Sequence, residues 1–248
     1  MTLELTHKVA LVTGAAHRVG LAIALELARA GMHIALHYGA SPPDQVEAAQ
    51  AQIAALGVRA IPFQADLRDA NAIPPLIEAV GAGFGRLDVL VNSASNFQRT
   101  RLGEITLDDW NTTLAINLTA PMLLTQAAAA LMLKHDPPGG VIVNIGDKGA
   151  LAPWVDFAAH GVSKAGLLAL TKLSAVSLAP HIRTNMVIPG LVLKPDATPD
   201  ERWHKLGAAT PMARPGSAED VARAVGYLVR EPYLNGAVIN VDGGEYLT

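Results

Sequence analysis

The chain alternates between short apolar runs and longer stretches in which apolar residues recur every three or four positions. Short runs rich in Val and Ile are typical of parallel strands covered on both faces, and the longer stretches are typical of amphipathic helices. We predict strands at Val9–Thr13, His33–Tyr38, Ala60–Ala65, Asp88–Asn92, Val141–Gly146, Thr184–Ile188 and Ala237–Val241. We predict helices that include Leu21–Ala30, Val46–Leu56, Leu118–Leu133 and Lys164–Leu178.

The regular alternation of strand and helix predicts the fold class. Such alternation builds right-handed βαβ units, so we expect an α/β protein with a Rossmann-type, doubly wound parallel sheet flanked by helices on both faces. No repeat or linker divides the chain, so residues 1–248 are predicted to form one domain. The segment 191–211 is rich in Pro and polar residues, and we expect a short helical excursion there that covers the ligand crevice.

Composition excludes several classes of protein and of site. Half of the 248 residues are hydrophobic, the net charge is −3, and no run of Lys or Arg occurs, which argues against nucleic acid or a membrane surface as partner. The chain has no cysteine, and its histidines lack metal-ligand spacing, so we predict no disulfide and no metal site. No signal peptide is evident, and no uninterrupted apolar stretch reaches the roughly 20 residues of a membrane span. We therefore expect a cytoplasmic protein that acts on a small molecule.

A glycine-containing turn follows the first predicted strand and leads directly into a helix. Glycines at such a turn allow the backbone to approach a pyrophosphate, whose negative charge is favoured at a helix N-terminus. The context of strand, turn and helix makes this pattern more specific than glycines alone. The sequence therefore predicts a dinucleotide site in which the turn contributes Gly14, His17, Arg18, Val19 and Gly20.

The turn and several later motifs resemble those of the short-chain dehydrogenase/reductase family over residues 8–244. The family fingerprint Thr-Gly-x-x-x-(Gly/Ala)-x-Gly begins at Thr13, with Arg18 in place of the middle glycine. Asn117 stands where the family has its active-site Asn, and residues 241–244 match a later landmark. The resemblance implies further cofactor contacts at Asp66, Leu67, Asn92, Ser93, Ala94, Lys164, Pro189 and Gly190.

The end of the second strand indicates which nicotinamide cofactor the chain prefers. NAD-selective sites usually place a carboxylate there, whereas this chain has no acid between Tyr38 and Asp44. Ser41 can donate a hydrogen bond to a ribose 2′-phosphate, and Arg18 can supply positive charge. We predict NADP(H) rather than NAD(H), with Tyr38 and Ser41 at the cofactor. Gly39 and Ala40 add no basic side chain here, which weakens this phosphate site.

The predicted chemical site contains a departure from the family. Lys164 stands at the family's catalytic Lys, but His160, four residues earlier, replaces the catalytic Tyr, and Asp147 replaces the catalytic Ser. Positions four apart share one helix face, so His160 and Lys164 should both face the crevice. Asn117 completes the expected catalytic set.

Several residues resemble the pteridine reductase and dihydromonapterin reductase branch of the family. They are Arg18, Asp147, Ser95 and Phe97. In that branch the Asp takes part in protonating or orienting the pterin, and the Phe stacks on it. We therefore expect Ser95, Phe97 and Asp147 to contact substrate. Trp154 lies in the loop between Asp147 and His160, and we expect it to line the same pocket.

Three interpretations of His160 remain open. In the first, His160 donates the proton itself, since unperturbed imidazole titrates at about pH 6.5. In the second, Asp147 and a water molecule transfer the proton. In the third, turnover is lost. The main functional prediction is an NADP(H)-dependent, pteridine-reductase-like oxidoreductase acting on a planar C=N or C=O substrate. The alternatives are a 3-oxoacyl or carbonyl reductase of the same family, and a catalytically impaired NADP-binding protein or partner subunit. The resemblance also implies a homo-oligomer, either a dimer or a tetramer.

Overall fold

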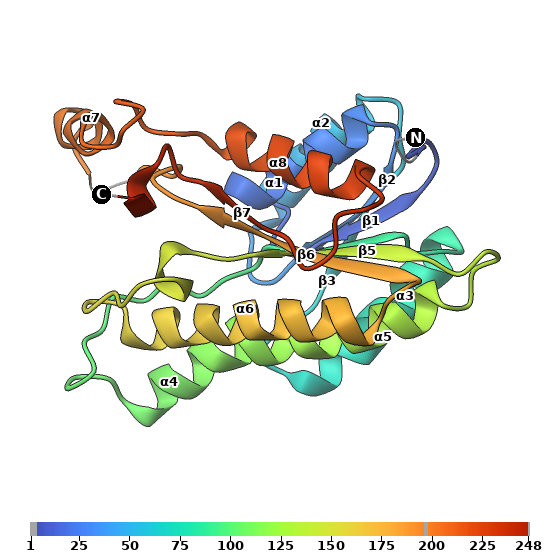
Figure 1. Cartoon of the computed structure of the whole chain (residues 1–248). Helices are drawn as coiled ribbons and strands as arrows, with labels where there is room; N and C mark the ends of the chain where they lie inside the picture. The colour runs from blue at the N-terminus through green and yellow to red at the C-terminus, as the bar shows by residue number, and fades with distance from the viewer. Residues whose placement is uncertain (1–3, 196–197, 248) are drawn as a thin grey trace.

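The structure, a computed structural model, describes residues 4–195 and 198–247. Seven parallel strands form one sheet in the order β3-β2-β1-β4-β5-β6-β7, which lies between two layers of helices (Figure 1). Its strands are β1 Val9–Val12, β2 His33–Tyr38, β3 Ala60–Gln64, β4 Val89–Asn92, β5 Gly140–Ile145, β6 Ile182–Pro189 and β7 Val238–Val241. The chain order reverses between β1 and β4, and in such sheets a ligand crevice forms at this switch point.

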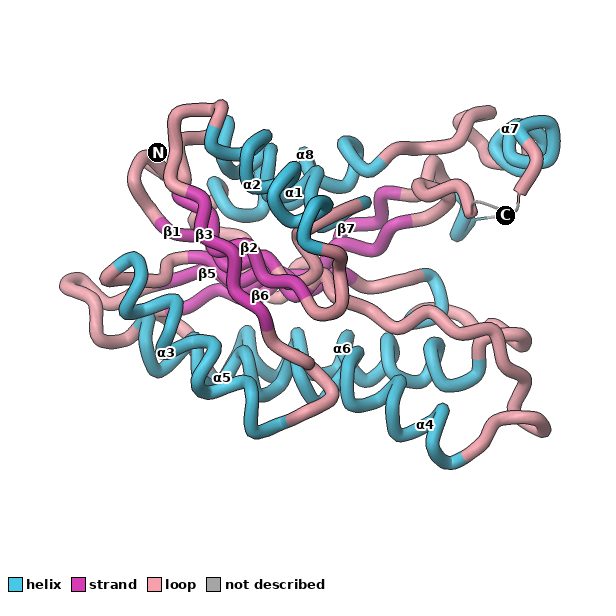
Figure 2. The backbone as a smooth tube through the Cα atoms, turned by 180° about the vertical axis from the view of Figure 1, so that it is seen from behind, coloured by secondary structure: helices cyan, strands magenta, loops and turns pink. Residues whose placement is uncertain are grey.

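The helices cover both faces of the sheet, and views from opposite sides show the same three layers (Figures 1 and 2). On one face lie α1 Arg18–Arg29, α2 Pro43–Ala54 and α8 Ala218–Arg230. On the other lie α3 Ile73–Phe84, α4 Leu107–Leu114, α5 Ala120–Met132 and α6 Ala158–Ser177. The remaining helix, α7 Asp200–Ala208, lies outside these layers, towards the end of the molecule where the described chain stops.

Each face of the sheet buries its own apolar cluster because successive residues of a strand point to opposite faces. Val12 and Leu36 pack with Ile23 of α1 in one cluster, whereas Leu11 packs with Leu124 of α5 in the other. All five side chains are fully buried. Burial on both faces explains why the strands appear in the sequence as continuous apolar runs.

The fold prediction is confirmed. Each predicted strand lies within two residues of the observed bounds at either end. The predicted helix Leu118–Leu133 belongs to a longer helical run made of α4, the π-helical turn η2 Ala115–Thr119 and α5. The helix predicted from Lys164 begins earlier, at Ala158. The predicted excursion 191–211 contains α7, and its residues 196 and 197 lie outside the described part of the chain.

Among residues 4–195 and 198–247, one helical stretch, Leu107–Met132, is long and apolar enough to cross a membrane by length and composition alone. In this fold its apolar face, with Leu124, Ala128 and Met132, belongs to the core on the α3 side of the sheet. The apolar window of this stretch is 39% buried, so packing against the sheet accounts for part of its apolar composition.

Candidate active site

The turn after β1 is shaped to receive an anion. Gly14 has a φ of 67°, and a Cβ at Gly20 would lie only 2.1 Å from the Gly14 carbonyl oxygen. A side chain at Gly20 is therefore excluded, and α1 begins directly against the turn. No side chain caps this helix, and its first turn contains no acidic residue. The first backbone N–H groups of α1 are thus available to a pyrophosphate, and this cradle fits a dinucleotide.

Arg18 stands in this cradle with strained backbone. Its φ is 55°, in the left-handed region that favours glycine, which is the residue the family fingerprint has at this position. Both Arg18 and His17 are exposed, so their side chains are free to face a bound ligand. The arginine therefore adds positive charge to the turn in a conformation that glycine adopts at lower cost.

The segment after β4 is tied to the same turn. The Thr13 hydroxyl oxygen accepts hydrogen bonds from the backbone N–H groups of Ser93, at 2.9 Å, and Ala94, at 3.0 Å. The amide of Asn92 donates to Asn144 Oδ1 at 2.8 Å, while Asn92 Oδ1 is buried and has no partner within the described residues. Asn92, Ser93 and Ala94 therefore lie beside the turn, as expected of a shared cofactor site.

The remaining predicted cofactor residues lie at the ends of other strands. Tyr38 closes β2 and Ser41 follows it, both partly buried. Asp66 and Leu67 follow β3, and the Arg68 guanidinium, 2.6 Å away, lowers the pKa of the exposed Asp66 carboxyl. Pro189 ends β6, where Gly190 donates its N–H to the Val241 carbonyl at 3.0 Å. All of these residues therefore lie at or just after the carboxyl ends of parallel strands.

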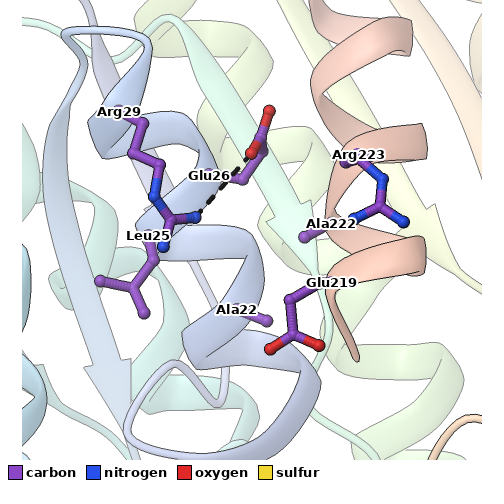
Figure 3. Close-up of a pocket in the computed structure, with 7 residues that line it drawn as sticks. All are labelled: Ala22, Leu25, Glu26, Arg29, Glu219, Ala222 and Arg223. Carbon is purple, nitrogen blue, oxygen red and sulfur yellow. Dashed lines mark ion pairs between the residues drawn. The ribbon is translucent and has the colours of Figure 1, made fainter. Parts of the chain in front are cut away.

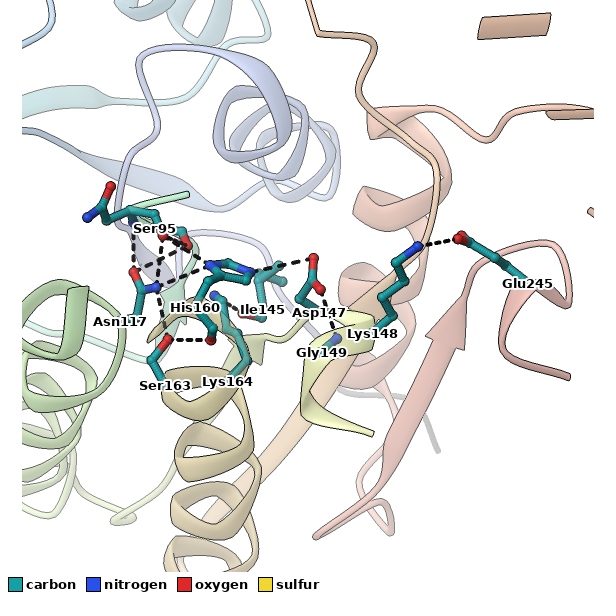
Figure 4. Close-up of polar contacts among 11 residues, drawn as sticks. Ser95, Asn117, Ile145, Asp147, Lys148, Gly149, His160, Ser163, Lys164 and Glu245 are labelled. Atoms are coloured by element: carbon teal, nitrogen blue, oxygen red, sulfur yellow. Dashed lines mark hydrogen bonds and ion pairs between the residues drawn. The ribbon is translucent and has the colours of Figure 1, made fainter. Parts of the chain in front are cut away.

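The predicted reaction residues meet in one corner (Figure 4). His160 lies in the first turn of α6, and its Nε2 is 3.7 Å from Oδ2 of Asp147. Asp147 precedes the short helix η3 Lys148–Ala150, and its Oδ1 accepts the Gly149 N–H at 2.9 Å. The second carboxylate oxygen is thereby left to face the imidazole.

The orientation of the imidazole is fixed from its other side. His160 Nδ1 lies 3.0 Å from the backbone oxygen of Asn96 and 3.4 Å from Nδ2 of Asn117. A carbonyl oxygen can only accept, so the shorter contact requires hydrogen on Nδ1, and the longer one then joins two donors and is not a hydrogen bond. Nε2 is consequently the nitrogen that faces the site. It is buried and has no hydrogen-bond partner among the described residues.

Asn117 holds the Asn96 backbone in place. Its Oδ1 accepts the Asn96 N–H at 2.7 Å, and its Nδ2 donates to the Asn96 carbonyl at 2.9 Å and to Ser163 Oγ at 3.0 Å. Asn117 lies in the π-helical turn η2, a distortion that often occurs at functional sites. The side chain is fully buried, so its first role here is to orient the backbone that orients His160.

Lys164 lies beneath His160, one helical turn further along α6. Its Nζ donates to the Ile145 carbonyl at 2.9 Å. Burial lowers the pKa of Lys164 to about 8, and the Asp147 carboxylate opposes that shift. Lys164 is therefore still charged at neutral pH, although it is almost entirely enclosed.

An aromatic cluster, made of Phe97, Trp154 and Phe157, covers the imidazole. The ring centroid of Phe97 is 4.5 Å from that of Phe157 and 4.8 Å from that of His160, which it meets edge to face. Trp154 lies 4.1 Å from Phe157, and Lys148 Nζ lies 4.6 Å from the Trp154 ring. Phe97 is nevertheless 55% exposed, so the cluster forms a surface that a substrate can meet.

The predicted substrate residues Ser95, Phe97, Asp147 and Trp154 thus belong to the same corner as the predicted catalytic set. Ser95 Oγ lies 3.3 Å from Asn117 Oδ1. Sequence reasoning missed Asn96, which contributes its backbone carbonyl. No residue-type signal could have revealed it, because any residue offers that carbonyl.

Comparison with known proteins shows which family the chain belongs to. Residues 14–245 match a family described as enoyl-(acyl carrier protein) reductase. A curated relative, 3-oxoacyl-[acyl-carrier-protein] reductase from Synechocystis, is 36% identical over 97% of both chains. The chain belongs to the short-chain dehydrogenase/reductase family.

Solved structures of this family superpose closely on the chain. FolM alternative dihydrofolate reductase 1 from Brucella canis, complexed with NADP, has a TM-score of 0.92 and 29% identity, with 99% of this chain and 96% of that one covered. A blue fluorescent protein from a metagenomic library, in complex with NADPH, has a TM-score of 0.89 and 37% identity, with 98% and 99% covered. The agreement over whole chains confirms a Rossmann-type oxidoreductase fold.

A shallow pocket on the surface of this short-chain dehydrogenase/reductase lies between α1 and α8 (Figure 3). Its volume is about 130 Å³, and its lining includes Glu26, Arg29, Glu219 and Arg223. Glu26 pairs with Arg29 at 4.0 Å, so these charges compensate each other. The pocket joins two helices on the outer face and contains none of the predicted site residues.

Proposed function

We propose that this short-chain dehydrogenase/reductase is an NADP(H)-dependent reductase of a planar C=N or C=O substrate, with His160 as proton donor. The observation that carries the proposal is the orientation of the imidazole. The Asn96 carbonyl accepts a hydrogen bond from the Nδ1–H group, so Nε2 is the atom that gives up or receives a proton in the site.

Asp147 supports this role by charge. Its carboxylate oxygen lies 3.7 Å from Nε2, which puts a negative charge beside the nitrogen that faces the site. This pairing of an acid with an oriented imidazole serves proton transfer in many enzymes. Asp147 replaces the polarising Ser of the family, and His160 replaces the Tyr. Both departures from the family pattern therefore belong to the same proposed proton-transfer pair.

Cofactor chemistry completes the reaction. When bound, the nicotinamide supplies the hydride that reduces the substrate carbon. Lys164, charged at neutral pH, is proposed to hold the nicotinamide ribose, and Asn117 fixes the Asn96 backbone on which His160 rests. The proton then passes from His160 Nε2 to the substrate nitrogen or oxygen.

The preference for NADP(H) rests on charge at the end of β2. No acidic residue stands between Tyr38 and Asp44, and Arg18 is exposed in the turn. The NADP and NADPH bound in the two structural relatives support the same choice. Titration of both reduced cofactors, followed by nicotinamide fluorescence, tests it: NADPH should bind more tightly, and tighter NADH binding contradicts the proposal.

Two substrate classes have support. The names of the curated relatives favour a 3-oxoacyl thioester carbonyl, and these relatives span the whole chain. Asp147 and the exposed ring of Phe97 favour a flat heteroaromatic such as a pterin, as does the structural relative named an alternative dihydrofolate reductase. More of the related proteins support the acyl carbonyl as substrate, whereas the residues of the site support the pterin.

A substrate panel decides between them. NADPH oxidation is followed with a 3-oxoacyl thioester, a simple ketone, a quinone and a dihydropterin, with wild type and His160→Gln side by side. Turnover that depends on His160 supports the reductase, and the substrate with the highest kcat/KM identifies the class. Tight NADPH binding without oxidation of any substrate would leave a binding protein or partner subunit and contradict the proposal.

We also propose that the chain forms a homo-oligomer through α5 and α6. Both helices carry exposed apolar side chains, which a monomer gains nothing by displaying. They are Met122 in α5, Leu133 directly after that helix, and Val162, Leu173 and Val176 in α6. Sedimentation of wild type and Leu173→Glu tests this: the wild type should sediment as a dimer or tetramer and the variant as a smaller species, and a monomeric wild type contradicts it.

A further inference from the structure

His37 is a buried histidine that takes no part in the proposed proton transfer. It lies in β2, near the carboxyl end of the strand, and is only 1% exposed. Its Nδ1 accepts the Gly14 N–H at 3.2 Å, and its Nε2 lies 3.1 Å from the Ala65 carbonyl oxygen. The imidazole therefore bridges the turn after β1 and the loop after β3.

These two partners allow one form of the ring. The Gly14 N–H can only donate, so Nδ1 must lack hydrogen, and the Ala65 oxygen can only accept, so Nε2 must carry it. The charged ring has hydrogen on both nitrogen atoms and would lose the bond to Gly14. Burial lowers the pKa of His37 to about 4, and the hydrogen bond to the Ala65 carbonyl opposes that shift in part. The neutral Nε2–H tautomer is thus present at neutral pH.

The bridge belongs to a larger set of contacts beneath the crevice. The backbone oxygen of His37 accepts the Ala15 N–H at 2.9 Å, so the residue holds the turn twice. On the other side of the turn, the Thr13 hydroxyl holds the segment after β4. Ala65 directly precedes Asp66, the first residue of the loop predicted to contact adenine. The segments that follow three strands, β1, β3 and β4, are joined through these two side chains.

We propose that His37 is a positioning residue for the dinucleotide, which holds the phosphate-binding turn and the loop after β3 at a fixed separation through its Nε2–H tautomer. This inference rests on the proposed cofactor binding. The residue itself is enclosed and touches no reacting atom. Its effect is expected on cofactor affinity, with kcat/KM for the substrate unchanged at saturating NADPH.

Three variants separate this role from general stability. His37→Phe keeps a ring of similar size and removes both bonds. His37→Asn keeps an acceptor near the position of Nδ1 and removes the bond to Ala65. His33→Phe is the matched control: it makes the same change at the opposite end of β2, where the His33 ring accepts the Arg59 N–H at 3.1 Å.

Calorimetric titration of NADPH measures the outcome. We expect His37→Phe to raise the NADPH Kd about tenfold, the effect of one or two lost hydrogen bonds. His37→Asn should fall between it and the wild type, and His33→Phe should bind as the wild type does. If the NADPH Kd of His37→Phe stays within about twofold of the wild-type Kd, the inference is overturned. A wild type that binds no NADPH refutes the proposed function itself, so the two failures are distinguishable.

A second measurement reads the tautomer directly in the wild type. Long-range ¹H–¹⁵N NMR spectra report which ring nitrogen of a histidine carries hydrogen. The wild type at neutral pH should give the Nε2–H signature for His37, identified as the histidine signal that persists in His33→Phe and is absent from His37→Asn. A ring with hydrogen on Nδ1, or on both nitrogen atoms, overturns the proposal.

Discussion

The two ends of the crevice are built on different principles. At the dinucleotide end the contacts come from backbone N–H groups, glycines and uncharged buried side chains, with His37 held neutral by burial. At the reaction end they come from ionisable side chains, Asp147, His160 and Lys164, grouped under aromatic rings. The first end follows the family pattern except at Arg18, whereas the second departs from it at two of its three ionisable positions.

This difference shows which parts of such a site can change. A site made of backbone depends on conformation, so a single added Cβ can close it. A site made of side chains depends on chemistry, so one proton donor can replace another if the surrounding groups orient it. Substitutions at the two ends should therefore differ in what they damage.

The largest expected effect is on turnover at the reaction end. His160→Gln removes the proton donor but retains polarity and approximate volume, so kcat should fall by about 10²–10⁴-fold, the usual contribution of general acid catalysis. The NADPH Kd should not change. Steady-state kinetics and cofactor titration check this, with the exposed His181→Gln as a control for the same substitution. An unchanged kcat would assign the proton to Asp147 and water.

The converse change at the dinucleotide end is Gly20→Ala. Its Cβ would lie 2.1 Å from the Gly14 carbonyl oxygen, so the turn must open. The NADPH affinity should then fall on the order of 100-fold, because the preformed binding site is distorted. Gly103→Ala is the control, since nothing lies within 4 Å of a Cβ there. Equal NADPH binding by both variants in a titration would show that the turn does not hold the pyrophosphate.

The charge of Lys164 predicts how activity depends on pH. Its pKa is lowered to about 8, so the ammonium is lost as pH rises through that value. If the charged form is required, kcat/KM should fall about tenfold per pH unit above that pKa. A kcat/KM profile that stays flat up to pH 10 (roughly) would contradict a role for the ammonium.

Lys164 also makes a prediction for stability, with the opposite sign. The folded-state pKa of about 8 lies below the unfolded value near 10.5, so the unfolded chain binds more protons between them. The free energy of unfolding should therefore rise with pH across this window, by about 3 kcal/mol in total from this group. Urea denaturation of wild type and Lys164→Met checks it, because the variant should lose this rise.

The smallest expected effect belongs to Arg18. Arg18→Gly relieves the positive φ of 55°, which should raise the free energy of unfolding by about 1 kcal/mol. The same change removes positive charge, so NADPH should bind a few-fold more weakly while NADH binding is unaffected. Thermal unfolding and titration of both cofactors measure the two effects. A variant that loses stability would show that the arginine makes a compensating contact.

Much of the fold followed from the sequence because burial on both faces makes each parallel strand a continuous apolar run. The start of α6 did not, since its first turn carries His160 and Gly161, which interrupt the apolar period. The π-helical turn at Asn117 also lacks a sequence signal of its own. It inserts one residue into a helix whose apolar pattern continues on both sides.

The candidate site was predictable to a similar extent. Asp147, His160, Lys164 and Asn117 could be named because motif spacing identifies side chains. The role of Asn96 could not, because it acts through a carbonyl whose position depends on the tertiary structure. The role of His37 could not be predicted either, since its two partners are backbone groups of the turn after β1 and of the loop after β3.

The buried state of His160 Nε2 has a kinetic consequence. This atom is shielded from bulk solvent, and the Phe97 ring centroid lies 4.8 Å from that of the imidazole. A molecule that is to receive its proton can reach this nitrogen only when the side chains around the imidazole move, and the same motion exposes the nitrogen. Substrate access and exposure of the proton donor are therefore coupled, and water exchanges with this proton only during the same motion.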